Sequence, residues 1–241
     1  MKKQPTVQMS LVYDNNPHDE MLKTDWGFSC FAEGLEKSIL FDTGANGQIL
    51  LFNMEKLGLQ PERIDVVVLS HAHRDHTGGL EDLLVLNPKL EIWLPWFFGS
   101  DFKDQIRGKG AKVVEVNASR EICESSYTFG VIEGWIKEQS LVLDTEKGLI
   151  LMIGCAHPRI AQIIARVIEI FDKDISIALG GFRLAGFEKR EIKEIIRKFR
   201  DSGIKNVGFA QCSGDEARAL FYEEYKEDFI KIGVGKKIRI Q

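Results

Sequence analysis

The segment Ser70-His71-Ala72-His73-Arg74-Asp75-His76 is the most informative part of this sequence, because three histidines and an aspartate fall within six positions. Residues 65–69 (DVVVL) directly precede it, and such a short β-branched run is typical of a buried strand. Alternate residues of a strand share a side, so His71 and His73 point the same way as the chain leaves it. A turn then brings Asp75 and His76 round to the same opening.

This arrangement of imidazoles and a carboxylate indicates a metal site. Packed this closely without a metal, three imidazoles would repel one another on protonation, which leaves little reason to place them after a buried strand. Imidazole nitrogen and carboxylate oxygen suit zinc, iron or manganese. The alternative is a polar loop with incidental histidines, but HxHxDH is far more specific than HxH. We therefore expect a transition metal, with zinc first and manganese or iron as alternatives.

Strands and helices alternate on both sides of this segment. Strands are expected at 6–12, 27–33, 38–41, 65–69, 90–94, 111–116, 127–134, 139–144, 148–153, 175–179, 206–210 and 237–240. Helices are expected at 47–57, 79–86, 158–171, 189–200 and 215–225. The pattern predicts one α/β domain over residues 1–241, in which two mixed sheets pack face to face with helices outside, as a four-layer αββα sandwich.

Several of these strands end in a loop that contains glycine or polar residues and precedes a helix. The loops are residues 42–44, 70–79, 154–158, 180–183 and 211–215. Ligands collect at strand ends in α/β folds, so these loops are expected to form a single site at one edge of the sandwich.

Composition limits the classes of partner. The net charge of −4 argues against a nucleic-acid partner, because phosphate binding needs a basic face. The four cysteines are scattered without a CxxC pair, which favours reduced thiols. No apolar run has the length of a signal peptide or of a membrane span. We expect a cytoplasmic protein with a small-molecule substrate and no membrane partner; a homo-oligomer remains open.

Further motifs resemble a known family. FDTG ending at Gly44, the HxHxDH segment and GCAHP around His157 together resemble the metallo-β-lactamase superfamily over nearly the whole chain. More narrowly, LVYDNNP, DWGFSCF, ILFDTGANG and GCAHP resemble its dihydropteroate-synthase-like branch. That branch includes an archaeal enzyme of methanopterin assembly, which condenses a dihydropterin methyl diphosphate with a ribofuranosyl-aminobenzene phosphate. The resemblance implies the αββα sandwich and a metal-dependent activity.

The resemblance also implies which residues bind metal. The first metal site would consist of His71, His73 and His157, and three imidazoles plus water form an open catalytic zinc shell. The second site would rest on Asp75 and His76.

Two further histidines of the branch are replaced in this chain. Where the branch has GGFHL and HCTG, this chain has GGFRL ending at Leu184 and QCSG ending at Gly214, so Arg183 and Gln211 stand at the two histidine positions. The second site then has too few ligands, and one metal ion is expected rather than two.

Four other residues are candidates at the site. Arg183 can supply the charge of a missing metal, pair with Asp75 or hold a substrate phosphate in bidentate fashion, or it is a surface arginine. Gln211 is a poor ligand for a transition metal, and Cys212 is either a thiolate donor or a small buried residue. Asp42 can accept an imidazole N–H and so orient the ring, or it forms a turn before Thr43-Gly44.

These features predict a metal-dependent enzyme that acts on an anionic or phosphorylated small molecule. In a hydrolytic reaction, the metal activates water and Asp75 orients that water or takes its proton. In a transferase reaction, which the resemblance suggests, the site holds a diphosphate leaving group while an arylamine displaces it at a pterin methylene. The alternative is a degenerate module that binds metal or ligand without turnover.

Overall fold

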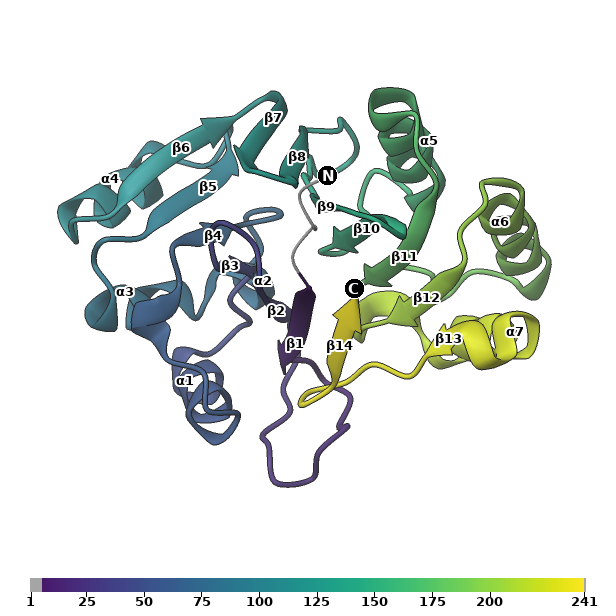
Figure 1. Ribbon diagram of the computed structural model, residues 1–241, viewed down its shortest axis with the longest axis horizontal. Coiled ribbons are helices and arrows are strands. Elements are labelled where there is room, and N and C mark those ends of the chain that lie inside the picture. The colour runs from purple at the N-terminus through teal and green to yellow at the C-terminus, as the bar shows by residue number, and fades with distance from the viewer. Residues whose placement is uncertain (1–5, 241) are drawn as a thin grey trace.

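The computed structural model describes residues 6–240, which contain two seven-stranded sheets that face each other (Figure 1). The first sheet has the spatial order β14 (Lys237–Ile240), β1 (Val7–Tyr13), β2 (Ser29–Glu33), β3 (Ile39–Phe41), β4 (Val66–Val68), β5 (Glu91–Pro95) and β6 (Lys112–Val116). The second has the order β13 (Phe229–Ile230), β12 (Asn206–Phe209), β11 (Ile175–Gly180), β10 (Gly148–Ile153), β9 (Leu141–Thr145), β8 (Ser126–Gly130) and β7 (Ala118–Cys123).

Helices cover the outer face of each sheet (Figure 1). On the first sheet lie α1 (Gly47–Lys56), α3 (Leu80–Leu86) and α4 (Ser100–Gly108). On the second lie α5 (Ile160–Phe171), α6 (Lys189–Asp201) and α7 (Asp215–Tyr225). The short helix α2 (Arg74–Thr77) belongs to the histidine segment, and 3-10 turns lie at Pro61–Arg63, Gln211–Ser213 and Lys226–Asp228. The αββα sandwich is therefore confirmed.

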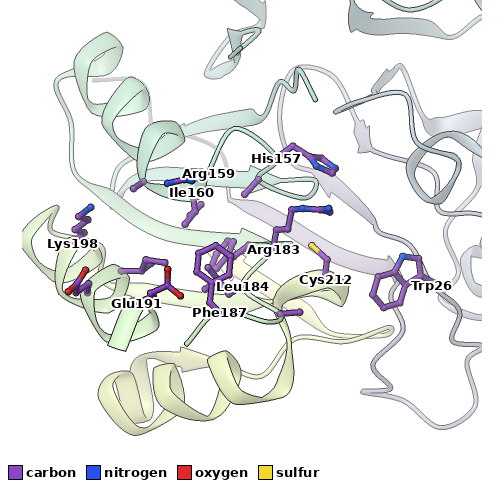
Figure 2. Close-up of a pocket in the computed structure, with 16 residues that line it drawn as sticks. Trp26, His157, Arg159, Ile160, Arg183, Leu184, Phe187, Glu191, Lys198 and Cys212 are labelled. Carbon is purple, nitrogen blue, oxygen red and sulfur yellow. The ribbon is translucent and has the colours of Figure 1, made fainter. Parts of the chain in front are cut away.

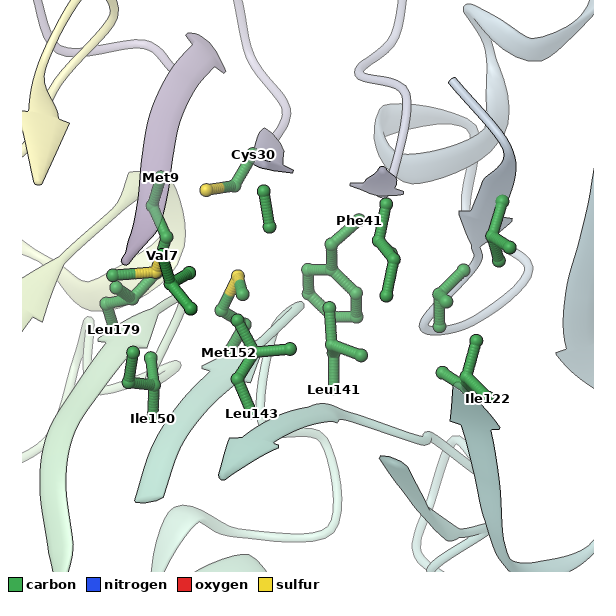
Figure 3. Packing of buried hydrophobic residues seen from close by; sticks show 14 of the residues in the cluster. Val7, Met9, Cys30, Phe41, Ile122, Leu141, Leu143, Ile150, Met152 and Leu179 are labelled. Atoms are coloured by element: carbon green, nitrogen blue, oxygen red, sulfur yellow. The ribbon is translucent and has the colours of Figure 1, made fainter. Parts of the chain in front are cut away.

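The central core lies between the two sheets (Figure 3). Alternation along the strands explains which side chains enter it: Leu141 and Leu143 of β9 point inward, whereas Val142 packs under the outer helices. Because both faces of each sheet are covered, the strands consist of nearly continuous apolar runs. The same covering explains why the run before the histidine segment contains no polar residue between Val66 and Leu69.

Both sheets repeat one pairing pattern, which positions the loops. In the first sheet β3, β4, β5 and β6 run parallel, and in the second β10, β11, β12 and β13 do so. The carboxyl ends of parallel strands share one edge of a sheet, where α/β proteins bind ligands. The loops that follow β3, β4, β10, β11 and β12 therefore emerge at these two edges.

Several elements differ from the sequence-based expectation, among them the two-residue strand β13 and the short helix α2, which were not predicted. The strand expected over 127–134 ends at Gly130, whose φ of 88° takes the chain out of the strand. Strand β7 was not predicted, because it lies at a sheet edge and residues 118–121 are exposed. Helix α4 was not predicted either, because its nine residues bury only Lys103 and Ile106 and so show no clear apolar stripe. Within residues 6–240, no helix is long and apolar enough to cross a membrane.

Candidate metal centre

Nitrogen atoms of three histidines converge where the two sheets meet. Nε2 of His71 lies 3.1 Å from Nδ1 of His73 and 3.2 Å from Nε2 of His157. His71 and His73 follow β4 of the first sheet, and His157 follows β10 of the second. Any two ligand nitrogens of a tetrahedral zinc shell with 2.0–2.1 Å bonds stand about 3.3 Å apart, so both spacings fit such an ion. All three atoms lie within 4.8 Å of one another.

The protonation states of His71 and His157 also favour the binding of a cation. Burial, followed by the charges of neighbouring imidazoles and Arg183, lowers the pKa of His71 well below its usual value. Burial, followed by the charge of Arg183, lowers the pKa of His157 to about 4. Both rings are therefore neutral near pH 7 and keep a lone pair for a metal.

Asp42 fixes the orientation of this cluster from a completely buried position. Its Oδ1 accepts the backbone N–H of Ser70 at 2.7 Å, and its Oδ2 accepts the Ser70 hydroxyl at 2.8 Å. Since that hydroxyl donates to Asp42, it accepts from Nδ1–H of His71 at 2.8 Å. This chain of hydrogen bonds places the proton of His71 on Nδ1 and leaves Nε2 free for a metal.

His76 lies between two carboxylates. Its Nδ1 is 2.6 Å from Oδ2 of Asp42, and its Nε2 is 3.3 Å from Oδ2 of Asp75. Burial alone would lower the pKa of His76, but the charge and hydrogen bonds of the two aspartates more than offset it and raise it to about 10. Burial would likewise raise the pKa of Asp75, but hydrogen bonding to His76 and its charge lower it to about 2.

Gln211 and Cys155 complete the surroundings of His76. The amide nitrogen of Gln211 is 2.9 Å from Nε2 of His76 and 3.2 Å from Sγ of Cys155. Sγ of Cys155 is itself 3.2 Å from Nε2 of His76. Cys155, His76 and His71 also bring one ligand atom each within 4.8 Å of one another. The amide of Gln211 thus lies among the atoms that would have to hold a second ion.

Sequence reasoning missed Cys155 and Glu138. Cys155 sits two residues before His157, and its sequence spacing gave no sign that its thiol reaches His76. Glu138 is fully buried in the 131–140 connection, and its carboxylate accepts the backbone N–H groups of Cys155, Ala156 and His157 at 2.8, 3.1 and 2.9 Å. It therefore holds the loop that carries His157.

Arg183 and Cys212 lie beside the cluster in different ways. Arg183 lines a pocket together with His157 and Cys212 (Figure 2). Among residues 6–240, no ion pair joins Arg183 to Asp75. Cys212 is buried, and its Sγ approaches the backbone oxygen of Cys155 at 3.7 Å. Its position is that of a small buried residue next to Cys155.

Several non-glycine residues of these loops adopt left-handed backbone conformations. Asp42, Ala156, Arg159 and Arg183 have φ values of 57°, 60°, 76° and 46°. Such conformations cost free energy and persist where the surrounding structure enforces them, which happens most often at functional sites. The strain therefore falls on the same loops as the histidine cluster.

Comparison with known proteins matches the chain to a family model and to two relatives of similar length. The model of the metallo-beta-lactamase superfamily matches residues 29–95. The 7,8-dihydropterin-6-methyl-4-(beta-D-ribofuranosyl)-aminobenzene-5'-phosphate synthase of Methanocaldococcus jannaschii is 30 % identical over 253 residues, covering 86 % of this chain and 86 % of that protein. An uncharacterised protein of the same organism is 26 % identical over 263 residues, covering 96 % of this chain and 100 % of that protein.

Solved structures agree on the fold. Tm1679, described as a metal-dependent hydrolase of the beta-lactamase superfamily, has a TM-score of 0.81 at 24 % identity and covers 97 % of this chain and 99 % of its own. The metallo-beta-lactamase fold protein YhfI of Bacillus subtilis has a TM-score of 0.73 at 12 % identity, with 98 % and 99 % covered. At these identities the likeness concerns the fold alone.

Proposed function

The chain belongs to the metallo-β-lactamase superfamily, and we propose that it is a zinc-dependent enzyme acting on an anionic or phosphorylated small molecule. One observation carries this proposal: nitrogens of His73 and His157 lie 3.1 and 3.2 Å from Nε2 of His71, and all three atoms lie within 4.8 Å of one another beside a pocket. The same site serves hydrolysis and a pterin-type transfer, and both remain within the proposal.

One zinc ion would be held by His71, His73 and His157. When bound, it supplies Lewis-acid chemistry, which lowers the pKa of a water molecule and polarises a phosphoryl or carbonyl oxygen. The buried hydrogen-bond chain from Asp42 through Ser70 keeps the acceptor atom of His71 directed at this position. The amide of Gln211 beside His76 favours one ion over two.

The remaining residues of the site would act on the substrate and the attacking group. The Asp75 carboxylate is partly accessible and can accept a hydrogen bond from the attacking water or amine, which orients it. The Arg183 guanidinium at the pocket can hold an anionic oxygen of the substrate with two parallel N–H groups.

The transfer reaction has its own support. The relative that is 30 % identical over most of its length is a dihydropterin-linked synthase by name. In a transfer, Arg183 would hold a diphosphate leaving group, and an arylamine would take the place of water. The two reactions differ in a measurable way, because pyrophosphate release from a pterin methyl diphosphate requires an arylamine in the transfer and only water in the hydrolysis.

A degenerate binding module is the second candidate, and the position of Gln211 favours it. An amide instead of an imidazole next to His76 leaves a two-metal reaction without its second ion. Such a module would bind zinc at the three histidines without any turnover.

Metal content per chain, measured by inductively coupled plasma mass spectrometry, tests the proposal. We expect about one equivalent of zinc in protein purified without added metal or after zinc incubation, and its loss in His71→Ala. His18→Ala, at an exposed loop position, is the matched control and should keep its zinc. If no metal binds after incubation with zinc, manganese or iron(II), the proposed enzyme is ruled out.

A further inference from the structure

A cavity of about 560 Å³ begins at the histidine cluster and continues along helices α5 and α6. Figure 2 shows Trp26 and Lys198 at opposite ends of it, with Arg183 beside His157. Its middle part is apolar and is formed by side chains from two segments, the start of α5 and the connection between β11 and α6: Ile160, Leu184 and Phe187. The cavity therefore extends beyond the histidine cluster and has room for a part of a substrate that does not react there.

Three cations line this cavity: Arg159, Arg183 and Lys198. Among residues 6–240, none of the three forms an ion pair with a carboxylate within 4.0 Å. Arginines outside the cavity do form ion pairs with carboxylates, as Arg166 does with Glu169 on the exposed side of α5. The cavity thus concentrates unpaired positive charge in a chain whose net charge is −4.

The two carboxylates of the cavity wall are already engaged. Oε2 of Glu191 accepts the backbone N–H of Glu188 and so caps α6. Oε1 of Glu194 lies 3.5 Å from Nε of Arg190, which stands on the same helix. Neither carboxylate forms an ion pair with Arg159 or Lys198, and the three cations of the lining outnumber its two carboxylates by one.

The backbone around Arg159 adds to this excess of positive charge. Arg159 precedes the twelve-residue helix α5 and has a φ of 76°, and no side chain caps the helix there. Ile160 and Ala161, the first residues of that helix, line the cavity. Free N–H groups at a helix start attract anions, and here they adjoin an unpaired guanidinium.

We propose that the cavity selects an elongated small molecule with two anionic groups. One group lies at Arg183 beside the metal centre, the body lies on the apolar middle, and the second group, a phosphate or carboxylate, lies at Arg159 and Lys198. The proposal names the substrate class for the enzyme proposed above and rests on it. Arg159 and Lys198 are its specificity-determining residues, because they line the cavity without belonging to the candidate ligand set.

Binding of non-hydrolysable probes tests this inference. The probes are phenylphosphonate and biphenyl-4-ylphosphonate, each compared with its para-carboxylate by isothermal titration calorimetry on the full chain. We expect the carboxylate to improve affinity at least about tenfold for the spacer that spans the cavity, because hydrogen bonds to charged groups contribute this much. Arg159→Gln and Lys198→Gln should abolish the gain without weakening the plain phosphonates, whereas Arg183→Gln should weaken all four probes.

Two comparisons keep the outcomes separate. Arg166→Gln, on the exposed side of the same helix as Ile160, is the matched control and should leave every affinity unchanged. Titrations with zinc-loaded and chelator-treated protein should show the same gain, so a failure to bind zinc rejects the proposed function without deciding this inference. The inference is overturned if neither carboxylate binds more tightly, or if the gain survives in Lys198→Gln, an exposed helical position where substitution preserves the fold.

Discussion

Oδ2 of Asp42 lies 2.6 Å from Nδ1 of His76, and both side chains are fully buried. The same carboxylate binds Ser70, whose hydroxyl contacts His71. One buried carboxylate therefore contacts His76 directly and His71 through Ser70, so its removal should affect both imidazoles of the candidate metal site.

We expect Asp42→Asn to lower zinc affinity about ten- to a hundredfold, because an amide cannot accept all the hydrogen bonds that the carboxylate accepts. Competition with a chromogenic chelator measures the effect. Asp65→Asn is a matched control, since Asp65 also accepts a backbone N–H, that of Ser38 at 2.8 Å, but far from the histidines. Equal affinity in Asp42→Asn and the parent protein would contradict the orienting role.

Gln211→His should raise the metal content from about one equivalent to about two. The substitution replaces an amide that contacts Nε2 of His76 with an imidazole, which is a good ligand for zinc. Mass spectrometry of metal content after zinc incubation measures this change. Gln105→His, at an exposed position of α4, controls for adventitious binding by an added histidine. A second ion already present in the parent protein would refute our interpretation of Gln211.

The second ion in Gln211→His should have a thiolate ligand from Cys155 rather than Cys212. Only Cys155 contacts His76, whereas Sγ of Cys212 faces a backbone oxygen. In cobalt-substituted Gln211→His we expect a sulfur-to-cobalt charge-transfer band, which Cys155→Ser removes and Cys212→Ser preserves. The reverse pattern would assign the thiolate to Cys212.

Glu138→Gln should destabilise the protein by about 2–4 kcal/mol. The amide can turn only one oxygen toward the three N–H groups that the carboxylate now accepts, and it places its own N–H₂ against the others. Urea unfolding followed by circular dichroism measures the free energy. Glu133→Gln, at an exposed position of the same connection, should change it little. Similar stabilities for both variants would show that the loop is held by other contacts.

Asp14 should make stability depend on pH between about 4 and 6. Burial raises its pKa from 3.8 to about 6, and hydrogen bonds from Asn16 only partly offset this. The folded protein then binds the proton more tightly than the unfolded chain, so this contribution is complete below pH 4 and is lost as pH rises through 6. It amounts to roughly 3 kcal/mol. Urea unfolding at pH 4.5 and 7 should therefore show a smaller loss of stability in Asp14→Asn than in the parent protein, and equal losses would refute the assignment.

Much of the fold could be predicted from the sequence because its signals are local. The run from Val66 to Leu69 is apolar since helices and the opposite sheet cover both faces of β4. Periodicity likewise indicated α5 and α6, where one face is buried and the other is charged. Strand β7 and helix α4 lacked such a contrast, because one lies at an edge and the other is short.

Part of the candidate site was predictable because its residues lie close together in the sequence. The HxHxDH spacing concentrates four groups in one segment, whereas the contact of Cys155 with His76 joins residues 79 positions apart. Glu138 had no motif at all, because its role consists of accepting backbone N–H groups from a loop that follows two strands later. The directions of Arg183 and Gln211 depend on left-handed or irregular loop backbone, which spacing does not encode.

Because both sheets contribute to the histidine cluster, the cluster can form only after residues of both sheets have been synthesised. His157 lies 86 positions after His71, and the last strand, β14, pairs with the first, as Val7 lies opposite Ile240. While the ribosome is still making the chain, the first sheet lacks its edge strand and the metal site lacks a ligand. If the site binds zinc as proposed, its three ligands are complete only after His157 has been synthesised, and the first half of the chain carries only His71 and His73.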